Sequence, residues 1–264
     1  MADTAKPQPT AWVEEIDNLG RTLKDLASGC RHLPSNPFQA RAFIDVHVTT
    51  LKKRGLEGLL PSPLMQQRQT LQDACTLHVA EFWKNLAEAC TQEGWELHGT
   101  TSRRLFCRGP FIELKNETVL VEGISATLTP YVPDLKNALK AHAEQLLPAR
   151  LEMPAFMEQL AKAYGRVASQ TTERPIEEVY RQWVLLAQKP AFWCNLDVKL
   201  FTPLGRAIFR ARLTEALRAG QRTADGRELR LGTTTQAKEA WELFSPGEGL
   251  VVQMGRLALV QSER

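Results

Sequence analysis

Length, composition and charge exclude several classes of protein for this chain. Its 264 residues are 43% hydrophobic and carry a formal net charge of +3, so there is enough apolar material for one large core or two smaller ones. No apolar run approaches the roughly 18 residues of a membrane-spanning helix. The first ten residues (MADTAKPQPT) lack the apolar stretch of a signal peptide. We therefore expect a soluble, cytoplasmic protein with a flexible leader at residues 1–10.

The cysteine and glycine patterns predict neither a metal site nor a cofactor. The five cysteines are scattered, with no C-x-x-C pair, which is typical of reduced thiols rather than a disulfide framework. Cys75 and His78 share a helix face, but Cys90 lies roughly 22 Å farther along the same predicted helix, at about 1.5 Å per residue. The chain also lacks the glycine-rich loops that bind phosphates or dinucleotides.

The first predicted helix begins after Pro9 and fades near Gly29, and its apolar residues recur at steps of four and three. This spacing places them along one seam of an amphipathic helix. The seam either packs on its own domain or contacts a partner protein, and we take its members as candidate partner-binding residues. They are Trp12, Ile16, Leu19, Leu23 and Leu26.

Two more helices are predicted before the pattern changes, one at residues 38–54 and a long one at residues 64–93. From Trp95 to Thr129 apolar and polar residues alternate, with turn residues at Gly109-Pro110. This pattern favours a small antiparallel sheet. We expect the helices and the sheet to form a first domain at residues 11–130, although the sheet could equally belong to the second domain.

The remaining residues, 131–264, predict a second helical domain. Prolines open three helical segments there, and a polar run at residues 168–174 separates the last two. Two β-rich runs flank Met254-Gly255, so we expect the chain to close with a β-hairpin. The predicted fold is α+β and mainly helical, with a small central antiparallel sheet, and a last helix followed by a hairpin is compatible with a winged-helix arrangement.

A basic helix at residues 202–220 is the best-marked element of this second domain. Thr202 is the predicted N-cap, Pro203 the first helical residue and Gly220 the terminating residue. Projection at 100° per residue places several polar side chains on one stripe, with a further arginine beyond the helix end. A stripe of this kind suits the phosphates of DNA or RNA, or the acids of a neighbouring protein surface. The candidate nucleic-acid-binding residues are Arg206, Arg210, Thr214, Arg218 and Arg222.

Aromatic residues also gather in this half of the chain. We expect them to pack inside the domain, with stacking on exposed bases as the alternative. They are Trp183, Phe192, Trp193, Phe201 and Trp241.

Glu113 and Lys115 are the candidate catalytic residues. A carboxylate and a lysine two positions apart on a strand form the core of many metal-dependent nucleases. Such a site needs a second acid, for which Glu96 and Glu122 are the nearest candidates.

These patterns leave three hypotheses for function. The leading one is a non-enzymatic accessory or adaptor subunit of a larger cytoplasmic complex, which binds other protein subunits and possesses a basic C-terminal helix for DNA or RNA. One alternative is a metal-dependent nuclease built on Glu113 and Lys115. The other is a purely protein-binding scaffold.

Overall fold

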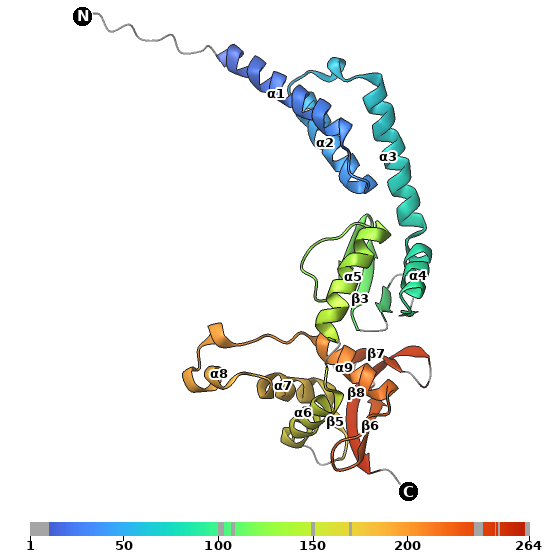
Figure 1. The fold of residues 1–264 in the computed structure, drawn as a ribbon, viewed down its shortest axis with the longest axis vertical. Helices are drawn as coiled ribbons and strands as arrows, with labels where there is room; N and C mark the ends of the chain where they lie inside the picture. Colours follow the sequence, from blue (N-terminus) through green and yellow to red (C-terminus); the bar gives the residue numbers. More distant parts are fainter. Residues whose placement is uncertain are drawn as a thin grey trace, which may run out of the picture. The chain divides into compact units, whose positions relative to one another are not determined.

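The computed structural model describes residues 11–99, 103–106, 109–148, 151–168, 171–234, 240–245, 247 and 249–261 (Figure 1). The expected leader at residues 1–10 lies outside them. Contacts divide the chain into two compact units, Met1–Phe82 and Trp83–Arg264. The sequence predicts a boundary near residue 130 and leaves the place of the small sheet open; in this division the sheet falls with the C-terminal helices. One contact between them is the 3.0 Å hydrogen bond between Nε2 of His142, on the helix after the sheet, and the carbonyl of Glu122.

The N-terminal unit is helical. Its core consists of buried Leu26, Ile44, Val48, Leu51 and Leu64. The Asn36 side chain accepts a bond from the Phe38 amide and thereby caps the second helix. The elements are α1 (Ala11–Arg31), α2 (Pro37–Lys53), a short 3₁₀ helix η1 (Glu57–Leu59) and α3 (Ser62–Ala80).

The single helix expected at residues 64–93 is wrong, because the chain forms two helices there. α3 ends at Ala80, Glu81 lies outside the helix, and α4 (Phe82–Gln92) follows at once. Neither glycine nor proline marks this break. It coincides with the division between the units: Leu71 packs on the N-terminal core, whereas buried Leu86 belongs to the C-terminal unit.

The predicted small sheet is confirmed. Four strands pair in sequence order, and every pairing is antiparallel. Leu105, Ile112 and Val119 are buried in successive strands. The strands are β1 (Leu97–Gly99), β2 (Arg103–Phe106), β3 (Phe111–Lys115) and β4 (Thr118–Val121).

The helices after the sheet follow the predicted segments, and most of them contribute to the core of the C-terminal unit. Trp183, Phe209 and Trp241 pack at its centre. No helix in the described part of the chain is long and apolar enough to cross a membrane. The elements are α5 (Val132–Leu146), α6 (Met153–Arg166), α7 (Ile176–Leu186), α8 (Pro190–Asn195), the 3₁₀ helix η2 (Val198–Leu200) and α9 (Arg206–Arg218).

α9 is the predicted basic helix, but it begins later than expected. Its N-cap is Gly205 rather than Thr202. Thr202 is occupied elsewhere, because its N–H donates to the side-chain oxygen of Gln188 at 2.7 Å and its carbonyl accepts from the same amide at 3.0 Å. The expected end is confirmed, since Gly220 follows the helix with φ of 58°.

A second antiparallel sheet closes the chain. The expected terminal hairpin is present, but β7 and β8 form it, and Met254-Gly255 lies inside one continuous strand. Glycine is required there because a Cβ on Gly255 would lie 2.3 Å from the Cβ of Thr234. Part of the polar run at residues 168–174 also joins this sheet. Its strands are β5 (Arg174–Pro175), β6 (Arg227–Thr233), β7 (Trp241–Ser245) and β8 (Leu250–Gln261), all paired to β8.

Candidate nucleic-acid interface

The predicted seam of α1 divides into a packed row and an exposed row. Leu26 is buried and Leu19 packs against the same core. Ile16 is 59% exposed and Leu23 is 37% exposed. The side chain of Trp12 lies outside the described residues. Packing within the unit therefore accounts for Leu19 and Leu26, whereas Ile16 and Leu23 face solvent in this chain.

The predicted arginine stripe on α9 is not one continuous free surface. Arg206 and Arg218 are exposed, but Arg210 and Thr214 between them are buried. Arg222, beyond the helix, pairs with Glu228. The helical projection gave the spacing correctly. It could not show that other elements of the unit cover the middle of α9.

Arg210 is the innermost basic group of this region. Its side chain is only 6% exposed and pairs with Glu122. The guanidinium lies 4.5 Å from the centre of the Phe111 ring and 6.0 Å from that of Trp241, both within cation–π range. No described residue accepts a hydrogen bond from its buried Nε. Arg210 is thus held firmly while one donor lacks a protein partner.

Arg206 lies one helical turn earlier and is half-exposed. Its Nη2 is 2.9 Å from Glu177 Oε2, which also accepts a bond from the Trp241 indole at 3.2 Å. The Arg206 guanidinium lies 5.3 Å from the Trp241 ring centre. Trp241 therefore lies within cation–π range of both Arg206 and Arg210.

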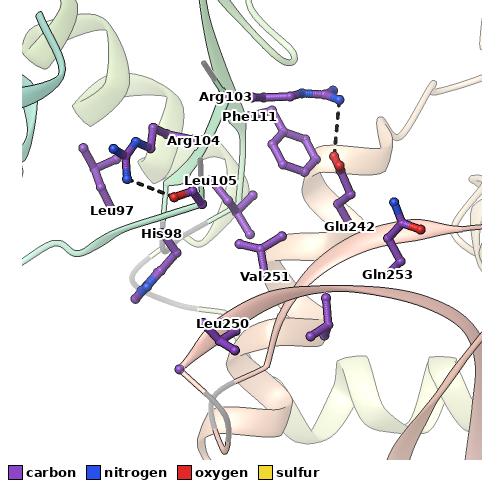
Figure 2. A pocket seen from close by; sticks show the side chains of 13 residues that line it. Leu97, His98, Arg103, Arg104, Leu105, Phe111, Glu242, Leu250, Val251 and Gln253 are labelled. Atoms are coloured by element: carbon purple, nitrogen blue, oxygen red, sulfur yellow. Dashed lines mark hydrogen bonds and ion pairs between the residues drawn. The ribbon is translucent and has the colours of Figure 1, made fainter. Parts of the chain in front are cut away.

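Arg103 on β2 is a site residue that we did not predict. Its guanidinium lies 4.3 Å from the Phe111 ring centre and its Nη1 lies 3.3 Å from Glu242 Oε2. Figure 2 shows Arg103 and Glu242 reaching toward each other beside Phe111. The consecutive arginines at positions 103 and 104 were the available signal. Nothing in the local sequence, however, indicated that β2 lies near β7.

Two adjoining clefts bring these arginines together. The first, which we call the arginine pocket, has a volume of about 300 Å³, and Arg103, Arg206 and Arg210 line it. The second, the intersheet cleft, has a volume of about 700 Å³ and lies between β1–β2 and the β7–β8 hairpin (Figure 2). Both clefts share Arg103, Phe111, Glu242 and Gln253. They form one connected basic surface.

The intersheet cleft adds two further nitrogen-bearing side chains. Arg104 donates to the Gly99 carbonyl at 3.0 Å (Figure 2). His98 stacks on Phe244 with ring centres 3.8 Å apart. Burial lowers the pKa of His98, and nearby Arg218 lowers it further, against the raising effect of Glu96. Burial therefore favours the neutral imidazole of His98.

The formal charges of the lining residues favour an anionic ligand in the two clefts. Four arginines line them against only two carboxylates, Glu122 and Glu242. Glu177 lies behind Arg206, as described above. The side chains of Arg103 and Arg206 are about half-exposed, whereas their partners Glu242 and Glu177 are 35% and 21% exposed. Ion pairs near the surface contribute about 0–1 kcal/mol each. An incoming anion can therefore exchange with these carboxylates at small cost.

Neither candidate nuclease residue lines the two clefts, although Glu113 is the cross-strand partner of Arg103. Glu113 and Lys115 form an ion pair of 3.5 Å at the end of β3. Glu122, the candidate second acid, pairs with Arg210 instead. Among the described residues no group of three histidine, cysteine or acidic side chains could hold a metal ion.

Comparison of the whole chain with known proteins found no matching protein family, no matching curated protein and no matching solved structure.

Proposed function

We propose that this protein is a non-enzymatic accessory subunit that holds a single strand of nucleic acid in the arginine pocket and the intersheet cleft. One observation carries the proposal: arginines from β2 and α9 converge on two connected clefts. Guanidinium groups bind phosphate oxygens in a bidentate manner. Successive phosphates of one strand would exchange for Glu242 and Glu177.

The burial of α9 favours a single strand over a duplex. A recognition helix in a winged-helix protein presents its exposed face to the major groove. On α9 the residues that would occupy such a face, Arg210 and Thr214, are buried. A narrow cleft lined by arginines instead suits a flexible backbone that can thread into it.

A salt-dependent binding experiment tests this proposal. Arg103→Gln with Arg206→Gln should weaken binding of a fluorescent oligo-dT to the full chain by about tenfold at low salt. Loss of two phosphate contacts should also reduce the slope of log K against log salt concentration by about 1.4, at about 0.7 per contact. Fluorescence anisotropy measures both quantities.

Arg166→Gln with Arg230→Gln is the matched control, since it removes the same charge from exposed positions outside the clefts. This variant should change affinity by less than about twofold. Equal losses in the two variants would mean that only net charge matters. Absence of oligo-dT binding by the unmodified protein would reject the proposal.

The accessory role also implies a protein partner, and the exposed row of α1 favours this second feature. Ile16 and Leu23 lie seven residues apart on the helix, so a partner's helix could cover both. Ile16→Glu with Leu23→Glu should abolish co-purification of a subunit from the protein's own cells, while Leu77→Glu, an exposed leucine on α3, should not. If the Ile16→Glu, Leu23→Glu variant still co-purifies with the same subunit, that subunit does not bind at the exposed row of α1.

A further inference from the structure

The segment at residues 189–201, which contains α8 and η2 and which we call the apolar loop, exposes large hydrophobic side chains. Trp193 is 46%, Leu196 70% and Val198 82% exposed. We expected the aromatic residues of this segment to pack inside the domain, which is wrong for Trp193. In Figure 1 α8 lies beyond α7, away from the second sheet, and the chain after it turns and runs back to α9. Exposed apolar groups gathered in one segment mark an interaction surface.

The apolar loop is a built structure with a fixed neck. The buried amide of Gln188 donates to the carbonyl of Thr202 and accepts from its N–H. The rings of Phe192 and Phe201, near the two ends of the loop, lie 5.5 Å apart. Leu196 has φ of 51°, a left-handed conformation that is costly for leucine. A strained and exposed leucine on a fixed loop indicates a role outside the loop itself.

An apolar hollow lies beside the loop. Its volume is about 330 Å³, and it opens between α7 and residues 201–204. Nearly all of its lining is hydrocarbon, from Tyr180, Val184, Leu185 and neighbouring residues. The same surface thus carries an apolar projection and an apolar hollow of a size that accepts aliphatic side chains.

We propose that the apolar loop is a self-association surface. Two copies of this chain would pack about a two-fold axis, so that the apolar loop of each copy fills the apolar hollow of the other. Such an axis makes each contact twice, so one self-complementary patch suffices. A flat lipid surface would cover the projection but would leave the hollow unfilled. The charges also suit a second copy, because Asp197 and Lys199 are both exposed, two residues apart on the loop, and each can face the opposite charge on the partner.

Mass measurement over a concentration series tests the proposal. The full chain should sediment as a dimer at micromolar concentration, and Val198→Asp should raise the dimer dissociation constant at least about a hundredfold, because it would bury an unpaired charge. Leu196→Asn removes an apolar group while suiting the left-handed backbone, so it should weaken the dimer without loss of fold. Val46→Asp on α2, also an exposed valine (64%), should leave the dimer unchanged.

Cys194 provides an independent reporter, since it is an exposed thiol within α8. Mild oxidation of the unmodified protein should produce a disulfide-linked dimer that Cys194→Ser abolishes. A monomer at all concentrations, or a dimer insensitive to Val198→Asp and Leu196→Asn, would overturn the proposal. So would co-flotation of the unmodified monomer with anionic phosphatidylserine vesicles that Val198→Asp prevents, because a membrane would then be the occupant.

Discussion

The inner and outer ion pairs of the arginine pocket use the same chemistry in different surroundings. The inner pair, Arg210 and Glu122, has side chains 6% and 30% exposed, whereas the outer pair, Arg103 and Glu242, has side chains 50% and 35% exposed. Removing one partner of a buried pair leaves a charge without compensation, but an exposed charge is simply hydrated. The comparison teaches that the same ion pair stabilises the fold where the arginine is buried, as at Arg210, and contributes little where it is exposed, as at Arg103.

The largest expected effect comes from breaking the inner pair. Glu122→Ala should lower the free energy of unfolding by about 3 kcal/mol, because it leaves the Arg210 guanidinium buried without its carboxylate. Glu242→Ala, at the outer pair, should cost less than about 1 kcal/mol. Urea unfolding followed by tryptophan fluorescence measures both. Equal costs would show that burial does not distinguish the two pairs.

The next largest expected loss of stability comes from substitution of Gly109, which lies beside the inner pair. Gly109, whose carbonyl lies 3.4 Å from Arg210 Nη1, has φ of 133°, and a Cβ there would lie 2.7 Å from the Cβ of Ala211 on α9. Gly109→Ala should therefore cost at least about 2 kcal/mol. Gly165→Ala in α6, where no atom lies within 4 Å of the added Cβ, should stabilise by up to about 1 kcal/mol. Thermal unfolding of both variants decides whether α9 and Gly109 are as closely packed as described.

The outer region should respond to pH through His98. Its pKa is lowered in the folded protein, so the free protein loses stability as pH falls below about 6.5, where the unfolded chain takes up the proton first. A polyanion in the cleft would favour the charged imidazole. Oligo-dT affinity should therefore rise severalfold between pH 7.5 and pH 5.5, and His98→Gln should remove this rise. An unchanged pH dependence in the variant would separate His98 from the binding surface.

The smallest expected change in stability concerns a surface ion pair, between Asp225 and Arg227. Asp225 accepts bonds from Arg227 and Thr223, which lower its pKa from 3.8 to about 2. Its contribution to stability is complete above pH 3.8 and is lost as pH falls through 2. NMR titration of the Asp225 carboxyl group in Arg227→Gln should show its pKa moving toward 3.8. A midpoint that stays near 2 would assign the shift to Thr223 instead.

Local patterns predicted most elements because their signals are local. The spacing of Leu135, Leu139 and Leu146 defined α5, and the alternation of Ile112 and Leu114 with polar neighbours defined β3. The errors arose where a distant residue decides. Thr202 fails as an N-cap because Gln188 binds its backbone, and the glycine at position 255 is needed inside a strand, rather than in a turn, because Thr234 approaches it closely.

The candidate site was predicted only in part for the same reason. The spacing of Arg206 and Arg210 was visible in the sequence, but their difference in burial depends on Glu122, 88 residues before Arg210. Arg103 reaches the site from β2 because the two sheets lie beside each other, and no sequence motif records that contact. The aromatic residues of the apolar loop were likewise visible in the sequence, but their pattern did not show that Trp193 is exposed.

The amide of Gln188 also has a consequence for how this protein tolerates change. The buried side chain of Gln188 joins the two ends of residues 189–201. The hydrogen bonds to Thr202 thus offset the entropy lost when these ends come together. Each residue added to the loop should then lower the free energy of unfolding by only a few tenths of a kcal/mol or less. We therefore expect residues 189–201 to accept insertions without disturbing the rest of the C-terminal unit. Variation in the length or composition of this segment could alter what the protein assembles with while α7, α9 and the arginine pocket stay as they are.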